Sequence, residues 1–288
     1  MENSVNVNQK TFLGHPMGLF ILFFTELWER FSYYGMRAIL VLYLVSETSG
    51  DNPGMGWSDS SALALYGWYT MFVYLATIPG GILADRYLGQ RKSVMLGGLL
   101  LCFGHGILAV EALWAFYTGL AFIVLGVGCL KGNISTMVGG LYGKNDHNKR
   151  DMGFYIFYMG INIGAAVSAL LVGYIGEVYN WHYGFGLAGI GMAIGQIGYW
   201  KGQKYLTHVG NLIKLEPNKE DKSDNLFLQI FKKTNSLVGF SITALIGIYI
   251  GISGDWNYGL LFIAIAFAIG FAIVVYNDGN KIEKDRIL

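Results

Sequence analysis

The chain has 288 residues, of which 53% are hydrophobic, 15% aromatic and only 14% charged. Soluble globular proteins carry about 25% charged residues, so this composition excludes an ordinary soluble enzyme and a disordered chain. Lysine and arginine (20) nearly balance aspartate and glutamate (19), which excludes the basic excess expected of a nucleic-acid-binding protein.

Long apolar segments follow one another along the chain. A membrane helix needs roughly 20 mostly apolar residues, and by this measure we predict eight spans, over residues 16–46, 60–84, 93–111, 115–142, 152–178, 184–206, 236–254 and 258–277. We therefore predict an all-α membrane protein. Its parts would be a six-helix bundle (1–206), a cytoplasmic linker (207–235), a two-helix transmembrane hairpin (236–277) and the start of a further linker (278–288).

Positive charge is distributed unevenly over the segments between these spans. Alternate segments, beginning with the N-terminus, hold 17 lysines and arginines, whereas the intervening segments hold none. Lysine and arginine accumulate in cytoplasmic loops, so both termini are predicted to be cytoplasmic.

The first span carries ionisable side chains at membrane depth. Wound as a helix at 3.6 residues per turn, it places six polar side chains within a stripe about 140° wide: Glu26, Glu29, Arg30, Tyr33, Tyr34 and Arg37. A charge at mid-membrane costs roughly 2.5–3.5 kcal/mol on the insertion scale. An i,i+4 pair of Glu26 and Arg30 could serve only to hold helices together, but Gly and Ser achieve helix packing at far lower cost. We therefore favour the interpretation that this stripe lines a polar pathway through the bundle.

Lys131, on the fourth span, is a further buried cation without an assigned partner. A lysine and an arginine that face a cavity suit a ligand carboxylate, while two neighbouring glutamates suit proton exchange. The residues therefore indicate a pathway for an anionic or zwitterionic solute coupled to protons. We expect no enzyme activity, metal or cofactor, because the chain shows no nucleophile–base pair and no ligand cluster.

Residues 80–92, GGILADRYLGQRK, join the second and third spans. Gly80 and Gly81 are predicted to let a neighbouring helix approach closely. Asp85 and Arg86 follow in a tight turn, where they serve either as a simple cytoplasmic anchor or as a conformational latch between two states.

Two motifs carry a resemblance to a known family. GGILADRYLGQRK resembles the loop motif G-x-L-a-D-R-x-x-G-R-[KR] of the major facilitator superfamily, and ELWERFSYYG (26–35) resembles the ExxERFxYYG motif of proton-dependent oligopeptide transporters, the POT or PTR family. Lys131 in GCLKGNIS and Asn162 in FYMGINIGA also match family positions. The chain departs from the family at Gly132, where proline is usual, and at Gly67-Trp68, where animal members place a histidine.

The resemblance implies a role for each matching position. Proton coupling would fall to Glu26, Glu29, Arg30 and Lys131, with Lys131 able to bridge to a glutamate. A di- or tripeptide substrate would contact Tyr33, Tyr34, Arg37, Tyr74, Lys131 and Asn162, with Arg37 and Lys131 at its carboxylate. The conformational latch would comprise Gly81, Asp85, Arg86, Gly89, Arg91 and Lys92.

The resemblance also implies a bacterial cytoplasmic (inner) membrane protein surrounded by lipid, with protons as the coupling ion. The superfamily has two six-helix halves, and this chain supplies one half and a hairpin. We therefore expect an N-terminal fragment that needs a C-terminal bundle to move solute. The alternatives are another facilitator, for nitrate, drugs or sugars, and a non-transporting truncated membrane protein.

Overall fold

The computed structural model describes residues 10–143 and 145–212. These residues belong to a compact unit that extends from Met1 to Lys214. The predicted hairpin (236–277), the predicted tail (278–288) and all but the first residues of the predicted linker (207–235) lie outside the described residues.

The described part is almost entirely helical. A short antiparallel pair, β1 (Thr11–Phe12) and β2 (His15–Pro16), precedes the first helix. The α-helices are α1 (Met17–Val45), α2 (Asp59–Leu75), α3 (Thr77–Leu83), α4 (Gln90–Leu108), α5 (Leu113–Gly140), α6 (His147–Val178) and α7 (Trp181–Gly202). A π-helical turn, η1 (Ala84–Leu88), follows α3, and a 3-10 turn, η2 (Gln203–Tyr205), follows α7.

Each of the first six predicted spans coincides with helix, although their ends differ. The second, predicted as one helix over 60–84, is instead divided into α2, α3 and η1, because Pro79 lacks the amide that a continuous helix would use. Among the described residues, three helical segments are long and apolar enough to cross a membrane: Asp59–Leu88, Leu113–Gly140 and His147–Val178. Helix α1 is not among them, and its charged residues Glu26, Glu29, Arg30 and Arg37 lie in the middle of its length.

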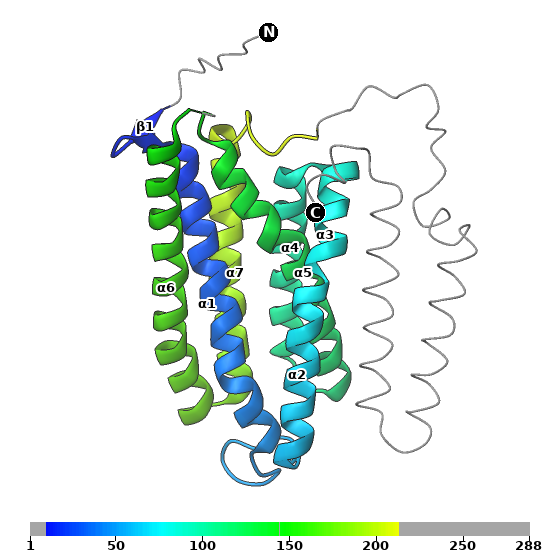
Figure 1. Cartoon of the computed structure of the whole chain (residues 1–288). Coiled ribbons are helices and arrows are strands. Elements are labelled where there is room, and N and C mark those ends of the chain that lie inside the picture. The colour runs from blue at the N-terminus through cyan, green and yellow to red at the C-terminus, as the bar shows by residue number, and fades with distance from the viewer. Residues whose placement is uncertain (1–9, 144, 213–288) are drawn as a thin grey trace, which may run out of the picture. The chain divides into compact units, whose positions relative to one another are not determined.

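The helices pack in the order α6–α1–α7–α4–α5, with α2 and α3 against α5 (Figure 1). Glycine permits the closest approaches. A Cβ atom at Gly164 of α6 would collide with the carbonyl oxygen of Leu27 on α1, and one at Gly97 of α4 would lie 2.6 Å from the carbonyl oxygen of Gly126 on α5. These two pairs of helices therefore contact each other backbone to backbone, as small residues allow in membrane helices.

The connecting segments gather at two ends of the bundle. At one end, Asn52 in the α1–α2 loop donates to the carbonyl of Gly176 (2.7 Å), and its own side-chain oxygen accepts from the amide of Trp181 (3.1 Å). At the other end, which we call the basic end, His15 hydrogen-bonds to Tyr142 (2.8 Å). The basic end comprises residues 10–16, 84–92, 141–143, 145–151 and 203–212.

The residues from Leu206 onward, the last of the predicted bundle and the first of the predicted linker, pack onto the other segments of the basic end. Leu206 is fully buried and Val209 is 5% exposed, and the amide of Arg91 donates to the carbonyl of Gly210 at 2.9 Å. Gly210 and Gly89 both have positive φ, 67° and 78°, a conformation that glycine adopts readily. The segment after α7 therefore continues the bundle as far as the described residues extend.

Candidate functional site

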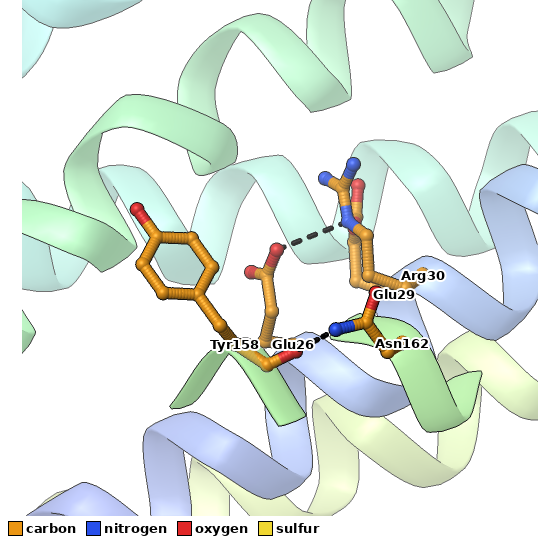
Figure 2. A network of polar contacts seen from close by, with 5 residues as sticks. All are labelled: Glu26, Glu29, Arg30, Tyr158 and Asn162. Atoms are coloured by element: carbon orange, nitrogen blue, oxygen red, sulfur yellow. Dashed lines mark hydrogen bonds and ion pairs between the residues drawn. The ribbon is translucent and has the colours of Figure 1, made fainter. Parts of the chain in front are cut away.

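Two glutamates and an arginine form a buried cluster on α1. The side-chain nitrogen Nε of Arg30 lies 3.0 Å from a carboxylate oxygen of Glu26, and Arg30 also pairs with Glu29. Glu29 is fully buried, and the other two residues are 3% exposed. Figure 2 shows the three side chains projecting from α1. Their sequence spacing of three and four residues places them on one helix face.

Several polar atoms of this cluster make no hydrogen bond within the described residues. They include one oxygen of Glu26, one oxygen of Glu29 and the terminal nitrogen Nη2 of Arg30. Two carboxylates share one guanidinium, so full ionisation leaves a net negative charge in a dry environment. A proton that neutralises one carboxylate would remove that uncompensated charge.

Arg37 lies two turns along the same helix and is held by tyrosines. Its Nε donates to the hydroxyl of Tyr66 on α2 at 2.9 Å. The guanidinium carbon is 5.0 Å from the centre of the Tyr66 ring and 5.4 Å from that of Tyr33. Cation–π contacts at these distances are attractive, and no carboxylate of the described residues pairs with Arg37.

Lys131 of α5 is also paired with an aromatic ring. Its Nζ lies 4.2 Å from the centre of the Tyr74 ring on α2, and within residues 10–143 and 145–212 it forms no ion pair. Its charge interacts at longer range with those of Arg30, Glu29 and Glu26. The expected bridge from Lys131 to a glutamate is therefore absent from this conformation, and it stays a prediction for another state.

The other predicted substrate contacts differ in exposure. Tyr33 is 3% exposed and lies edge-on to the half-buried Tyr34, with ring centres 5.5 Å apart. Tyr74 and Asn162 are exposed on α2 and α6. The amide of Asn162 donates to the carbonyl of Tyr158 in its own helix at 3.1 Å (Figure 2). Substrate contact by Tyr74 and Asn162 therefore stays a prediction.

Tyr66 and Tyr69 were not predicted from the sequence as members of this site. Tyr66 anchors Arg37, and Tyr69 is 4% exposed with a hydroxyl that has no hydrogen-bond partner among the described residues. Tyr69 also interacts electrostatically with Arg37 and Glu29. The i,i+3 spacing of these tyrosines, followed by Tyr74, is the signal that could have found them.

The predicted latch lies at the basic end. Asp85, Arg86 and Lys92 are exposed, and no ion pair involving them occurs in the described part of the chain. Gly89 packs against the segment after α7, since a Cβ atom there would lie 2.6 Å from the amide nitrogen of Leu212. The latch itself stays a prediction.

The expectation for Gly81 was wrong. A Cβ atom at Gly80 would collide with the backbone of Gly128, but one at Gly81 would meet none of the described residues within 4 Å. The two glycines are neighbours on a helix and point about 100° apart. Only one of them can therefore face α5, and it is Gly80.

Comparison with known proteins identifies the family to which this chain belongs. The profile PTR2, described as the POT family, matches residues 91–243. The chain belongs to the POT family. A di-/tripeptide transporter of Lactococcus lactis subsp. cremoris is 42% identical over 296 residues, which cover 99% of this chain and 57% of that relative. The resemblance noted from the two motifs is thus confirmed, and the family is one of transporters, not enzymes.

Solved POT-family structures share the fold. A crystal structure of a peptide transporter POT with sulfate has a TM-score of 0.71 and 42% identity, covering 85% of this chain and 52% of that one. A POT-family transporter with a thioalcohol-conjugated peptide has a TM-score of 0.73 and 37% identity, covering 87% and 50%. Two curated relatives each match 99% of this chain, whereas the chain spans only 57% of the length of each relative.

Proposed function

We propose that this chain is the N-terminal half of a proton-coupled symporter of di- and tripeptides in the bacterial cytoplasmic membrane. It would cross the membrane eight times, with the basic end and both termini in the cytoplasm, as the distribution of lysine and arginine favours. The second six-helix bundle would be its partner, since alternating access moves one half against the other.

One observation carries the proposal: two cations without carboxylate partners in the described structure lie near a buried acid cluster. Arg37 and Lys131 contact neutral tyrosine rings, so their charges remain available to an anion. Glu26 and Glu29 share Arg30. The first pair suits the carboxylate of a peptide, and the second suits a proton that is taken up and released.

Coupling follows from the charges of these groups. A peptide carboxylate that binds Arg37 and Lys131 adds negative charge close to the acid cluster, which favours protonation of one glutamate. Protonation frees part of the charge of Arg30. Protons are therefore the proposed coupling ion, and the scheme uses no cofactor.

The test is uptake of a labelled dipeptide into proteoliposomes under a pH gradient. The protein is this chain joined to the C-terminal part of the Lactococcus lactis relative. Glu29→Gln should abolish gradient-driven uptake and retain counterflow exchange, whereas Glu111→Gln, at an exposed acid, should alter neither. Unchanged gradient-driven uptake by Glu29→Gln would contradict the coupling assignment.

Other facilitator substrates and a non-transporting protein are the competing functions. Competition assays with nitrate, sugars and dipeptides distinguish a peptide transporter from a facilitator for another substrate. For the second, an antibody to residues 207–235 measures the size of the native product in membranes. A band well above 31.8 kDa supports a longer transporter, and a band at that mass favours a protein that needs a separate partner chain.

A further inference from the structure

The second span bends immediately after Tyr74. Helix α2 ends at Leu75 and α3 begins at Thr77. Pro79 has no N–H group, so the carbonyl of Leu75 loses its usual helical donor. The hydroxyl of Thr77 donates to the carbonyl of Tyr74 at 2.6 Å. The backbone that carries Tyr74 is thus interrupted at a defined place.

The bend rests directly on the backbone of α5 at Gly128. A Cβ atom at Gly128 would lie 2.5 Å from the carbonyl oxygen of Ala76 and 2.8 Å from its Cβ, while one at Gly80 would collide with the carbonyl of Gly128. Real Cβ atoms essentially never make contacts below 3.0 Å. Neither glycine could therefore gain a side chain unless the bend moved away from α5.

Asn133 adds a polar tie at the same contact. Its side-chain amide is 2.8 Å from the carbonyl of Cys129 in its own helix and 3.4 Å from the carbonyl of Gly80 in α3. The side chain is buried, at 4% exposure. Displacement of α3 from α5 would break the longer of these two contacts, so the amide favours the observed separation of the two helices.

Lys131 lies between these two contact points in the sequence. Gly128 precedes it by three residues and Asn133 follows it by two, and its Nζ is 4.2 Å from the ring of Tyr74. The glycine contact and the amide tie together set the separation of the two backbones that carry Lys131 and Tyr74. We propose that Gly128 and Asn133 are positioning residues that hold Lys131 against Tyr74 and so set the affinity for a substrate carboxylate.

This inference rests on the proposed function, and it makes a distinct kinetic prediction. Small misplacements of binding groups weaken the interactions that depend on their geometry. Gly128→Ala and Asn133→Ala should raise the KM for a dipeptide with a free carboxylate about tenfold, the equivalent of one lost charge contact. The KM for the same dipeptide with a C-terminal amide should change little, and the maximal rate should be largely retained.

Two controls on the same helix isolate the effect. Within the part of the chain that the structure describes, a Cβ atom at Gly132 would meet nothing within 4 Å, and the hydroxyl of exposed Thr136 bonds only to a carbonyl of α5 itself at 3.1 Å. Gly132→Ala and Thr136→Ala should keep the carboxylate-to-amide preference of the parent. A merely structural role of Gly128 would lower uptake of both peptides equally.

The outcomes separate the two proposals. Failure of the parent protein to take up either peptide would count against the proposed function. If the parent transports and discriminates while Asn133→Ala and Gly128→Ala keep its preference, the positioning role is wrong. If Gly128→Ala does not accumulate in the membrane, Asn133→Ala decides the question, because it removes side-chain hydrogen bonds and leaves the close contact of Gly128 with Ala76 and Gly80 in place.

Discussion

The two charged regions of the bundle are built in opposite ways. Glu26, Glu29 and Arg30 come from one helix, are at most 3% exposed, and form ion pairs with one another. Arg37 and Lys131 come from two helices and are half-buried. Tyrosines of α2 hold both, and neither has a carboxylate partner among the described residues.

The difference matches the two roles proposed for these regions, one toward a proton and the other toward a solute. Ion-paired groups in a dry interior balance their charges, and a single proton changes that balance strongly. A cation held by a neutral ring keeps its full charge, so it continues to attract an external anion. The acid cluster is thus suited to respond to protonation, and the tyrosine-held cations are suited to bind.

The largest effect should come from removing the cation of the acid cluster. Arg30→Leu leaves two buried carboxylates without compensation, and loss of one partner from a buried ion pair costs roughly 3–5 kcal/mol. We expect poor accumulation and a markedly lower Tm in detergent. The double variant Glu29→Gln/Arg30→Gln should recover part of the lost Tm. Equal Tm values for Arg30→Leu and for the double variant would show that the charges are not coupled.

Neutralising the tyrosine-held cations should affect substrate binding and spare the fold. Arg37→Gln or Lys131→Gln removes a charged hydrogen-bond donor, worth about 1.5–3 kcal/mol, or roughly 10- to 100-fold in KM for a peptide with a free carboxylate. The Tm should stay near that of the parent. If the affinities for the free acid and for the amide fall by the same factor, these cations do not bind the carboxylate. The distinction between the two regions would then be wrong.

Tyr66 offers a finer test of how the binding region is held. Tyr66→Phe keeps the ring beneath Arg37 but deletes the hydroxyl that accepts its hydrogen bond. We expect the free energy of substrate binding to weaken by about 1 kcal/mol, which is roughly a fivefold rise in KM, while coupling to the proton gradient stays intact. Tyr87→Phe, at an exposed tyrosine of η1, is the matched control. An equal response from both variants would deny Tyr66 a role in positioning Arg37.

A variant remote from both regions provides the baseline. Asn52 joins the α1–α2 loop to the α6–α7 turn through hydrogen bonds to Gly176 and Trp181. Asn52→Ala should lower stability by about 1–3 kcal/mol and leave the carboxylate preference unchanged. Asn211→Ala, where the side chain bonds only to the carbonyl of Thr207 within the described chain, should have a smaller effect. Thermal unfolding of both variants compares them directly.

Much of the fold and the acid cluster could be predicted because their patterns are local. Apolar length predicts helices, and spacings of three and four residues align charges on one face whatever the neighbouring helices do. Glu26, Glu29 and Arg30 were therefore found together by winding a single segment. The prediction of an unbroken second helix failed at Pro79, although proline is itself a local breaking signal.

Contacts between side chains of two different helices were decided by the tertiary structure. Tyr66 beside Arg37, Tyr74 over Lys131, and Gly80 rather than Gly81 against α5 all follow from the rotation and depth at which helices pack. The packing of Leu206 and Val209 on the basic end likewise needs surfaces from distant segments. A helical period specifies which residues share a face, but the neighbour that this face meets is set by close packing between helices.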